Sequence, residues 1–266
     1  MLKDITLGQY YPVDSPLHRL DPRTKLFGTM VYIICLFLCN SWPGYLLATL
    51  VLIGIIRLSN VPFGYMVRGL RGILFLLLLS VSFNLFLTDG TVLFSLGILK
   101  VTQEGLKTAA FMALRLVYLV LGSTVMTLTT TPNALTDGME KGLGFLKRVR
   151  VPVHEMSMMM SIALRFIPIL MEETDKIMKA QMARGADFES GNLIQKAKAM
   201  VPLLVPLFVS AFRRATDLAM AMEARCYHGG DGRTKMKPLK YTAADRIAYL
   251  LLLLFFLLTL LLRWLF

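Results

Sequence analysis

The sequence is poor in acidic residues and in cysteine, and each shortage narrows the possible functions. Its 266 residues include 17 Asp and Glu against 29 Lys and Arg, for a net charge of +12. Such a basic surplus fits nucleic-acid binding, an anionic lipid surface or the cytoplasmic loops of a membrane protein. The three cysteines are Cys35 and Cys39, one turn apart in an apolar segment, and the isolated Cys226. We interpret them as structural, because a metal site at Cys226 and His228 lacks further nearby ligands.

The sequence also lacks the short motifs that carry enzyme chemistry. Residues 138–147 and 229–235 are rich in Gly and Lys but do not have the spacing of a phosphate-binding loop. No nucleophile elbow and no two-histidine metal helix is present. Glu172 and Glu173 are followed by lysines at helical spacing, which indicates salt bridges on a helix face and not a catalytic pair. We therefore expect no catalytic residue and no cofactor or metal bound by this chain.

Hydrophobic residues, in contrast, are in excess. They make up 56% of the chain, and the mean hydropathy is +0.61. Soluble domains contain about 45–50% apolar residues, so much of this excess must face lipid. Residues 250–262 are interrupted only by Thr259, and residues 109–128 form a second tract; with their flanks, both approach the ~20 residues of a spanning helix. The polar, acidic start of the chain does not fit a cleavable signal peptide.

The distribution of basic residues predicts the orientation in the membrane. Residues 129–242 contain 17 of the 29 Lys and Arg residues. Cytoplasmic loops of membrane proteins retain such residues, so this segment and the N-terminus are expected to be cytoplasmic. Aromatic and basic residues are not interleaved, and we therefore expect no nucleic-acid partner. The retention of basic segments on the cytoplasmic side of the lipid bilayer is enough to explain the positive net charge.

These patterns predict an all-α membrane protein with about five transmembrane helices. Residues 1–25 form a cytoplasmic N-terminal segment, residues 26–128 a membrane domain of about four helices, and residues 243–266 a C-terminal transmembrane helix. The first two membrane helices, 26–40 and 45–56, are shorter than a full span needs, which leaves open a re-entrant hairpin.

Between the membrane segments, residues 129–242 are predicted to form a cytoplasmic module of long amphipathic helices. Residues 153–184 and 193–225 have apolar side chains at helical spacing and charges on the opposite face. A spanning hairpin here would place Arg165 near the bilayer centre, at a cost of roughly 3 kcal/mol. We therefore expect both helices at or just below the cytoplasmic surface. Pro202 and Pro206 should bend the second one near its start.

Each long helix ends in a triplet of alanine, arginine and a small residue. The triplets are Ala183-Arg184-Gly185 and Ala224-Arg225-Cys226. A cation near a helix C-terminus is favoured by the helix dipole alone, which is a sufficient explanation for a single triplet. Two such triplets on successive helices indicate arginines that form bidentate bonds to carboxylates of another protein.

Methionine is concentrated in the same module. Ten of the 17 methionines lie in residues 153–225. Their commoner role is to fill gaps between helices, but flexible apolar side chains also suit a surface that adapts to several partners. We hypothesise that one face of the first long helix is such a surface, formed by Met156, Met159, Met160, Phe166 and Leu170.

Residues 15–26, Ser-Pro-Leu-His-Arg-Leu-Asp-Pro-Arg-Thr-Lys-Leu, resemble the N-terminal signature of the transmembrane T component of energy-coupling factor (ECF) transporters. The two arginine triplets and residues 227–234 resemble the same family. The resemblance implies a non-catalytic coupling subunit of an ATP-driven uptake transporter for vitamins or other micronutrients. It links two ABC-type ATPases, which hold ATP and Mg, to a substrate-capture S component in a bacterial cell membrane.

The resemblance also assigns roles to the candidate residues. It implies that Arg184 and Arg225 are the ATPase-coupling residues, and the hypothesised methionine-rich face then contacts the capture subunit. The family usually has glycine where Cys226 stands. This departure weakens the helix stop there and leaves open that the helix continues to Gly229 and Gly230.

The alternative function is a stand-alone secondary transporter or channel. Such a protein needs polar or broken helices that line a route through the bilayer. Asn84 and Arg115 are the main candidates for such a lining, and both fit interhelical contacts better.

Overall fold

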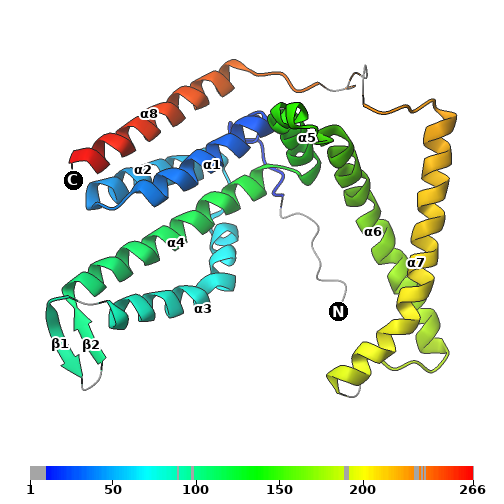
Figure 1. Ribbon diagram of the computed structural model, residues 1–266, viewed down its shortest axis with the longest axis horizontal. Helices are drawn as coiled ribbons and strands as arrows, with labels where there is room; N and C mark the ends of the chain where they lie inside the picture. The colour runs from blue at the N-terminus through cyan, green and yellow to red at the C-terminus, as the bar shows by residue number, and fades with distance from the viewer. Residues whose placement is uncertain are drawn as a thin grey trace. The chain divides into compact units, whose positions relative to one another are not determined.

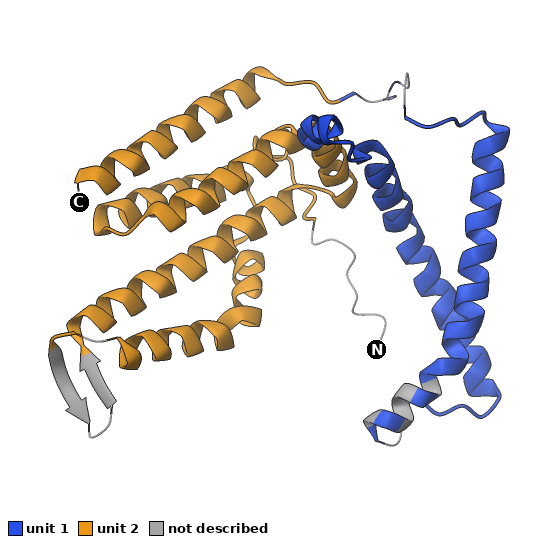
Figure 2. Ribbon diagram, in the orientation of Figure 1, with its two compact units in different colours: residues 1–7, 142–238 blue, residues 8–141, 239–266 orange. Residues whose placement is uncertain are grey.

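The computed structural model describes residues 10–88, 90–96, 99–188, 192–230, 234, 236 and 238–265. Its helices and strands are labelled in Figure 1. The chain divides into two compact units, coloured separately in Figure 2. Residues 8–141 and 239–266 form one, here named the membrane unit. Residues 142–238 belong to the other, here named the crossed-helix unit.

The described part of the membrane unit contains six helices, five of which share its main apolar core. Its helices α1 and α8 lie side by side, α3 packs along α4, and α4 also contacts α1 and α2. The core consists of apolar side chains from α1, α2, α3, α4 and α8, among them Cys35, Leu36, Ala48, Met66 and Val125. The helices are α1 Pro22–Leu38, α2 Trp42–Ser59, α3 Phe63–Leu87, α4 Gln103–Thr129, α5 Pro132–Gly142 and α8 Ala243–Leu265.

Local sequence explains where these helices begin. Asp21 precedes α1 and accepts a hydrogen bond from the Arg23 N–H, while Pro22 occupies the first helical position, where its missing N–H costs nothing. Thr102 caps α4 by accepting from the Gly105 N–H. A Cβ at Gly105 would lie 3.1 Å from the carbonyl oxygens of Asn84 and Leu85, so glycine lets α4 start against the end of α3.

A short β-hairpin joins α3 to α4. Strands β1 Val92–Leu96 and β2 Leu99–Thr102 are antiparallel, with Ser95 opposite Lys100. The apolar run 92–99 is too short to cross a bilayer, and β1, which contains its first five residues, pairs its backbone with β2 instead. This hairpin is an addition to the all-α architecture expected from the sequence.

Within the described residues, five helices are long and apolar enough to cross a membrane, which confirms the predicted all-α membrane fold. They are α2, α3, α4, α8 and α6 Val153–Ala183. The set differs from the sequence prediction in one member, because α6 qualifies while α1 has 17 residues and spans only about 26 Å. Length and composition do not separate a surface helix from a spanning one, so the cytoplasmic position of α6 stays a prediction.

The crossed-helix unit consists of a 3-10 turn, η1 Leu143–Val149, and the helices α6 and α7 Leu193–Ala224, which cross once in Figure 1. The helices have 31 and 32 residues, about 46 and 48 Å. Each ends one residue before the bound expected from sequence. Glu173 of α6 pairs with Arg214 of α7 at 3.0 Å, so this acid binds across the crossing and not along its own helix.

Candidate functional site

The first arginine triplet forms a defined turn at the end of α6. Ala183 is the last helical residue, Arg184 follows at φ −91° and ψ 6°, and Gly185 has a left-handed φ of +91°. The Gly185 N–H donates to the Met182 carbonyl and the Ala186 N–H to the Gln181 carbonyl, both at 3.0 Å. This pair of bonds is a Schellman motif, which stops the helix and satisfies its last carbonyls.

The second triplet forms the same turn at the end of α7. The Cys226 N–H donates to the Glu223 carbonyl at 2.8 Å and the Tyr227 N–H to the Met222 carbonyl at 3.0 Å. Cys226 takes the left-handed position at φ 54°. The continuation of the helix to Gly229 and Gly230, which the sequence left open, does not occur: α7 stops at Ala224, because two hydrogen bonds hold the cysteine in a conformation that glycine adopts more easily.

Both arginines occupy the same position in these turns, and both are exposed. Among the residues that the structure describes, neither guanidinium makes an ion pair or a side-chain hydrogen bond. Because Ala183 and Ala224 precede them, each arginine stands free of bulky neighbours at a helix end. A guanidinium presented in this way can form two parallel hydrogen bonds to a carboxylate of another protein.

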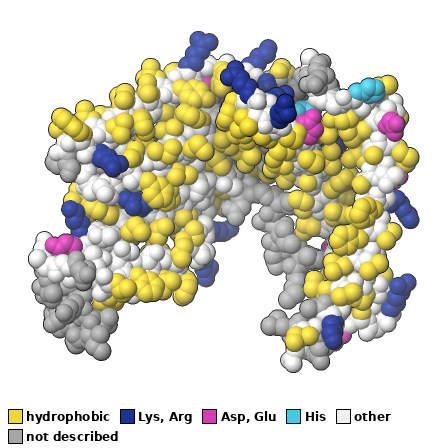
Figure 3. Space-filling view, viewed as in Figure 1, with side chains coloured by type: hydrophobic (Ala, Val, Ile, Leu, Met, Phe, Trp, Pro, Cys, Tyr) yellow, Lys and Arg dark blue, Asp and Glu magenta, His cyan; other side chains and the backbone are white. Residues whose placement is uncertain are grey.

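The candidate methionine face lies on α6. Met156, Met159 and Met160 are 49%, 57% and 44% exposed, while Phe166 and Leu170, further along the same face, are half-buried. The exposed part of the face is thus the first half of the helix, before the Glu173–Arg214 contact. Figure 3 shows hydrophobic side chains gathered along the helices of this unit.

Helix α7 carries a second exposed apolar stripe that the sequence analysis missed. It lies in the middle of the helix and consists of Val201, Leu204, Val205, Phe208, Val209 and Phe212, which are 46–69% exposed. Leu203, on another face, is buried. This part of α7 is apolar almost all round, a signal that the helix has one face on α6 and another available to a partner.

The N-terminal signature folds into a tight polar segment at the start of α1. Ser15 Oγ lies 2.7 Å from His18 Nδ1, and His18 Nε2 lies 3.0 Å from the Tyr11 carbonyl oxygen. Asp21 is buried and pairs with Arg23 at 2.8 Å. Burial raises the pKa of the Asp21 carboxyl, but the hydrogen bonds and charge of Arg23 outweigh it and hold that pKa below its usual range.

The two polar residues that a transport route would need serve as local contacts. The Asn84 side chain donates to the Ser80 carbonyl of its own helix at 2.8 Å. Arg115 of α4 donates to the Cys39 carbonyl at 3.1 Å and to Asn40 Oδ1 at 3.3 Å, beside the end of α1. Both side chains thus bond to oxygens of their own helix or of a nearby helix end. Within the described part of the chain, no three His, Cys, Asp or Glu side chains gather where a metal ion could bind.

Comparisons with known proteins give a single answer. The family model CbiQ, described as cobalt transport protein, matches residues 14–236. The Clostridium kluyveri protein named energy-coupling factor transporter transmembrane protein EcfT is 58% identical over 252 residues, 94% of this chain and 93% of that protein. The EcfT of Bacillus subtilis is 51% identical over 246 residues (92% and 93%), and that of Acidaminococcus fermentans 50% over 265 residues (99% and 98%).

Proposed function

The chain belongs to the CbiQ/EcfT family of transporter transmembrane proteins, and we propose that it couples two ABC-type ATPases to a substrate-capture membrane subunit. The carrying observation is the pair of matching turns that present Arg184 and Arg225. In this proposal each arginine docks in an acidic groove of one ATPase. Two long helices joined at one crossing then carry movement from the ATPases to the other partner.

The capture subunit binds the apolar faces of the crossed-helix unit. The exposed methionines of α6 and the apolar stripe of α7 form hydrophobic surface whose exposure to water is unfavourable and which a protein partner can cover. Methionine side chains repack easily, so one such surface can accept capture subunits of different shape. ATP and Mg are held by the ATPases, and the vitamin or other micronutrient by the capture subunit, so this chain needs no catalytic residue.

The proposed location is the bacterial cell membrane, with the N-terminus and the crossed-helix unit in the cytoplasm. Residues 129–242 contain most of the basic residues. If this segment lay outside the cell, it would violate the rule that the basic loops of membrane proteins stay in the cytoplasm. ATP is available on the same side. The β-hairpin between α3 and α4 and the end of α8 then face outward.

The proposal is tested by purifying the tagged complex and measuring ATPase content and ATP-driven uptake for Arg184→Glu and Arg225→Glu. Each change places a negative charge against an acidic groove, and loss of one partner from a buried pair costs about 3–5 kcal/mol. We expect each variant to lose most ATPase binding. Arg184→Lys should also bind less tightly, because a point charge does not replace a planar fork.

Arg213→Glu is the matched control, since Arg213 is an exposed arginine of α7 outside both turns. It should retain ATPases and uptake. Normal ATPase content and normal uptake in both glutamate variants at the turns would refute the docking assignment. Uptake by the wild-type protein without ATP would instead favour a stand-alone transporter.

A further inference from the structure

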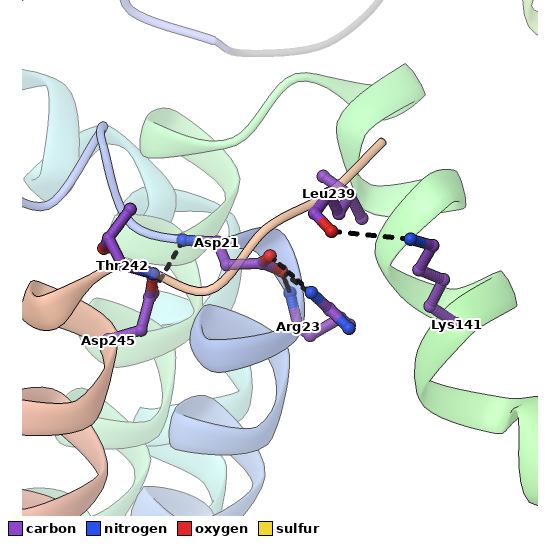
Figure 4. Close-up of polar contacts among 6 residues, drawn as sticks. All are labelled: Asp21, Arg23, Lys141, Leu239, Thr242 and Asp245. Atoms are coloured by element: carbon purple, nitrogen blue, oxygen red, sulfur yellow. Dashed lines mark hydrogen bonds and ion pairs between the residues drawn. The ribbon is translucent and has the colours of Figure 1, made fainter. Parts of the chain in front are cut away.

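Both chain connections of the crossed-helix unit start from one polar cluster of the membrane unit. The chain leaves the membrane unit after Lys141 and returns to it at Leu239. Lys141 Nζ lies 3.5 Å from the Leu239 carbonyl oxygen, so the segment that leaves the membrane unit and the segment that returns to it are in contact (Figure 4). The residues around this point hold both connections to the start of α1.

The returning connection is held by the N-terminal cap of α8. Asp245 Oδ2 accepts hydrogen bonds from the Thr242 N–H at 2.8 Å and from the Thr242 hydroxyl at 2.7 Å. Thr242 precedes the helix and Asp245 is its third residue, so the bond from the Thr242 N–H to Asp245 is one of the two bonds of a capping box. Asp245 is fully buried, so its carboxylate depends on these partners in place of water.

The other oxygen of Asp245 joins this cap to the cap of α1. Asp245 Oδ1 accepts from the Asp21 N–H at 2.8 Å, and the Asp21 carboxylate in turn binds Arg23. The Arg23 guanidinium lies 3.9 Å from the ring centroid of Tyr241, which is two residues before the first residue of α8, Ala243. Residues 241–245 are thereby fixed against the first turn of α1 by a hydrogen bond and a cation–π contact, and the Asp21–Arg23 ion pair orients the guanidinium that makes the second contact.

The outgoing connection sits on the same turn. At Gly138 of α5 an added Cβ would lie 2.9 Å from the Cβ of Pro22 and 3.2 Å from its carbonyl carbon, so α5 touches the backbone of α1. Lys25 Nζ donates to the Thr129 carbonyl, at the end of α4, at 2.8 Å. Only two residues separate α4 from α5, so fixing the end of α4 also fixes the start of the outgoing chain.

The charges of the cluster match the helix ends that they face. Two carboxylates lie at the N-termini of α1 and α8, where the helix dipole is positive, and Lys25 lies at the negative C-terminus of α4. The N-termini of α1 and α8 and the C-terminus of α4 are thus joined by charged groups whose signs suit these helix ends. Such a group resists displacement, because the carboxylates of Asp21 and Asp245 and the ammonium of Lys25 would lose their hydrogen-bond partners if the helix ends moved apart.

We propose that Asp21, Arg23, Lys25, Thr242 and Asp245 are positioning residues for energy coupling: they form the fixed anchor against which the crossed-helix unit moves. The inference rests on the proposed coupling function. A lever transmits force only when its attachment does not yield. If the anchor loosens, ATP-driven movement of the arginine turns is dissipated in the connections and does not reach α1, α4 and α8.

The test compares two threonine caps of the same membrane unit. Thr242→Ala removes a hydroxyl from the anchor, whereas Thr102→Ala removes the cap of α4 at its opposite end, where Thr102 is buried and bonded to Gly105 and Thr88. The complete complex, with its ATPases and capture subunit, is reconstituted in proteoliposomes. ATP hydrolysis and substrate uptake are measured together, and their ratio reports coupling.

We expect Thr242→Ala to lower uptake per ATP by about fivefold, as for loss of one hydrogen bond to a charged group, while hydrolysis continues. Asp245→Asn should lower it further, because its amide nitrogen would face the Thr242 N–H. Thr242→Ser restores the hydroxyl and should restore the ratio. Thr102→Ala should leave the ratio unchanged even where it lowers the yield of complex.

Three results would overturn the anchor: an unchanged ratio in Thr242→Ala, an equal fall of hydrolysis and uptake, or an equal change of ratio in Thr102→Ala. If Asp245→Asn does not assemble, the threonine variants decide the matter. Failure of the proposed function looks different, because the wild-type complex would then lack ATPases or take up substrate without ATP.

Discussion

At the scale of single residues, the two arginine turns differ in the residue that adopts the left-handed backbone. Gly185 has φ +91° and meets no steric penalty, whereas Cys226 has φ 54° with a Cβ. The left-handed region costs an L-residue about 1–2 kcal/mol relative to glycine. The turn that presents Arg225 is therefore under more strain than the turn that presents Arg184.

The expected consequence is that exchanges at these two positions shift stability in opposite directions. Cys226→Gly should stabilise the protein by about 1 kcal/mol, and Gly185→Val should destabilise it by about 1–2 kcal/mol. The midpoint of thermal unfolding of the purified protein measures both. Shifts of the same sign in the two variants would contradict the left-handed turn at one of them.

Residue patterns predicted the two turns in part. Ala-Arg-small at the ends of two long helical patterns located Arg184 and Arg225 correctly at helix ends. The sequence alone did not reveal that Cys226 stops α7, because propensity disfavours a non-glycine residue there, and the Tyr227 and Cys226 hydrogen bonds that compensate exist only in the folded turn.

At the scale of helices, hydrophobic periodicity predicted α6 and α7 within one residue at their ends, but it described only one apolar face of α7. Asp245 also escaped prediction: its role depends on Asp21, 224 residues away in the chain, and no local pattern reports such a contact. The apolar residues 92–96 form a strand because they pair with residues 99–102, and the hydropathy of one segment alone does not show such a pairing.

The face of α6 gives a test at this scale. Replacing Met156, Met159 and Met160 together with valine keeps the surface apolar but stiffens each side chain at χ1. The three side chains are exposed, so folding should change little, by less than about 1 kcal/mol per site. Binding of the capture subunits should weaken unequally, because a stiffer surface fits fewer shapes. Affinity for each capture subunit is measured with the purified ATPase-bound protein.

Met220→Val is the control for this triple change, since Met220 is 56% exposed but belongs to α7. It should leave all capture subunits bound. ATPase docking through Arg184 should be unchanged in both proteins. Equal affinity of the triple variant and the wild type for every capture subunit would leave these methionines as ordinary packing residues.

At the scale of the whole molecule, the proposed topology places the crossed-helix unit, which connects α5 to α8, on the cytoplasmic side of the membrane. It places the β-hairpin, which connects α3 to α4, on the opposite side. An even number of crossings separates the cytoplasmic N-terminus from the crossed-helix unit, provided that α1 and α2 return the chain to its starting side. The β-hairpin between α3 and α4 then faces outward. This arrangement follows from charge, because the arginine turns lie in the most basic segment of the sequence.

The wild-type protein carries its own probe of this arrangement. Cys226 is the exposed one of the three cysteines, whereas Cys35 and Cys39 are buried. In intact cells, a membrane-permeant maleimide should label Cys226 and an impermeant maleimide should not. Thr91→Cys in a Cys226→Gly background provides the opposite case, because Thr91 is exposed beside the hairpin and should react with both reagents. Labelling of wild-type Cys226 by the impermeant reagent from outside would place the arginine turns away from ATP, and the coupling function proposed for them could not operate.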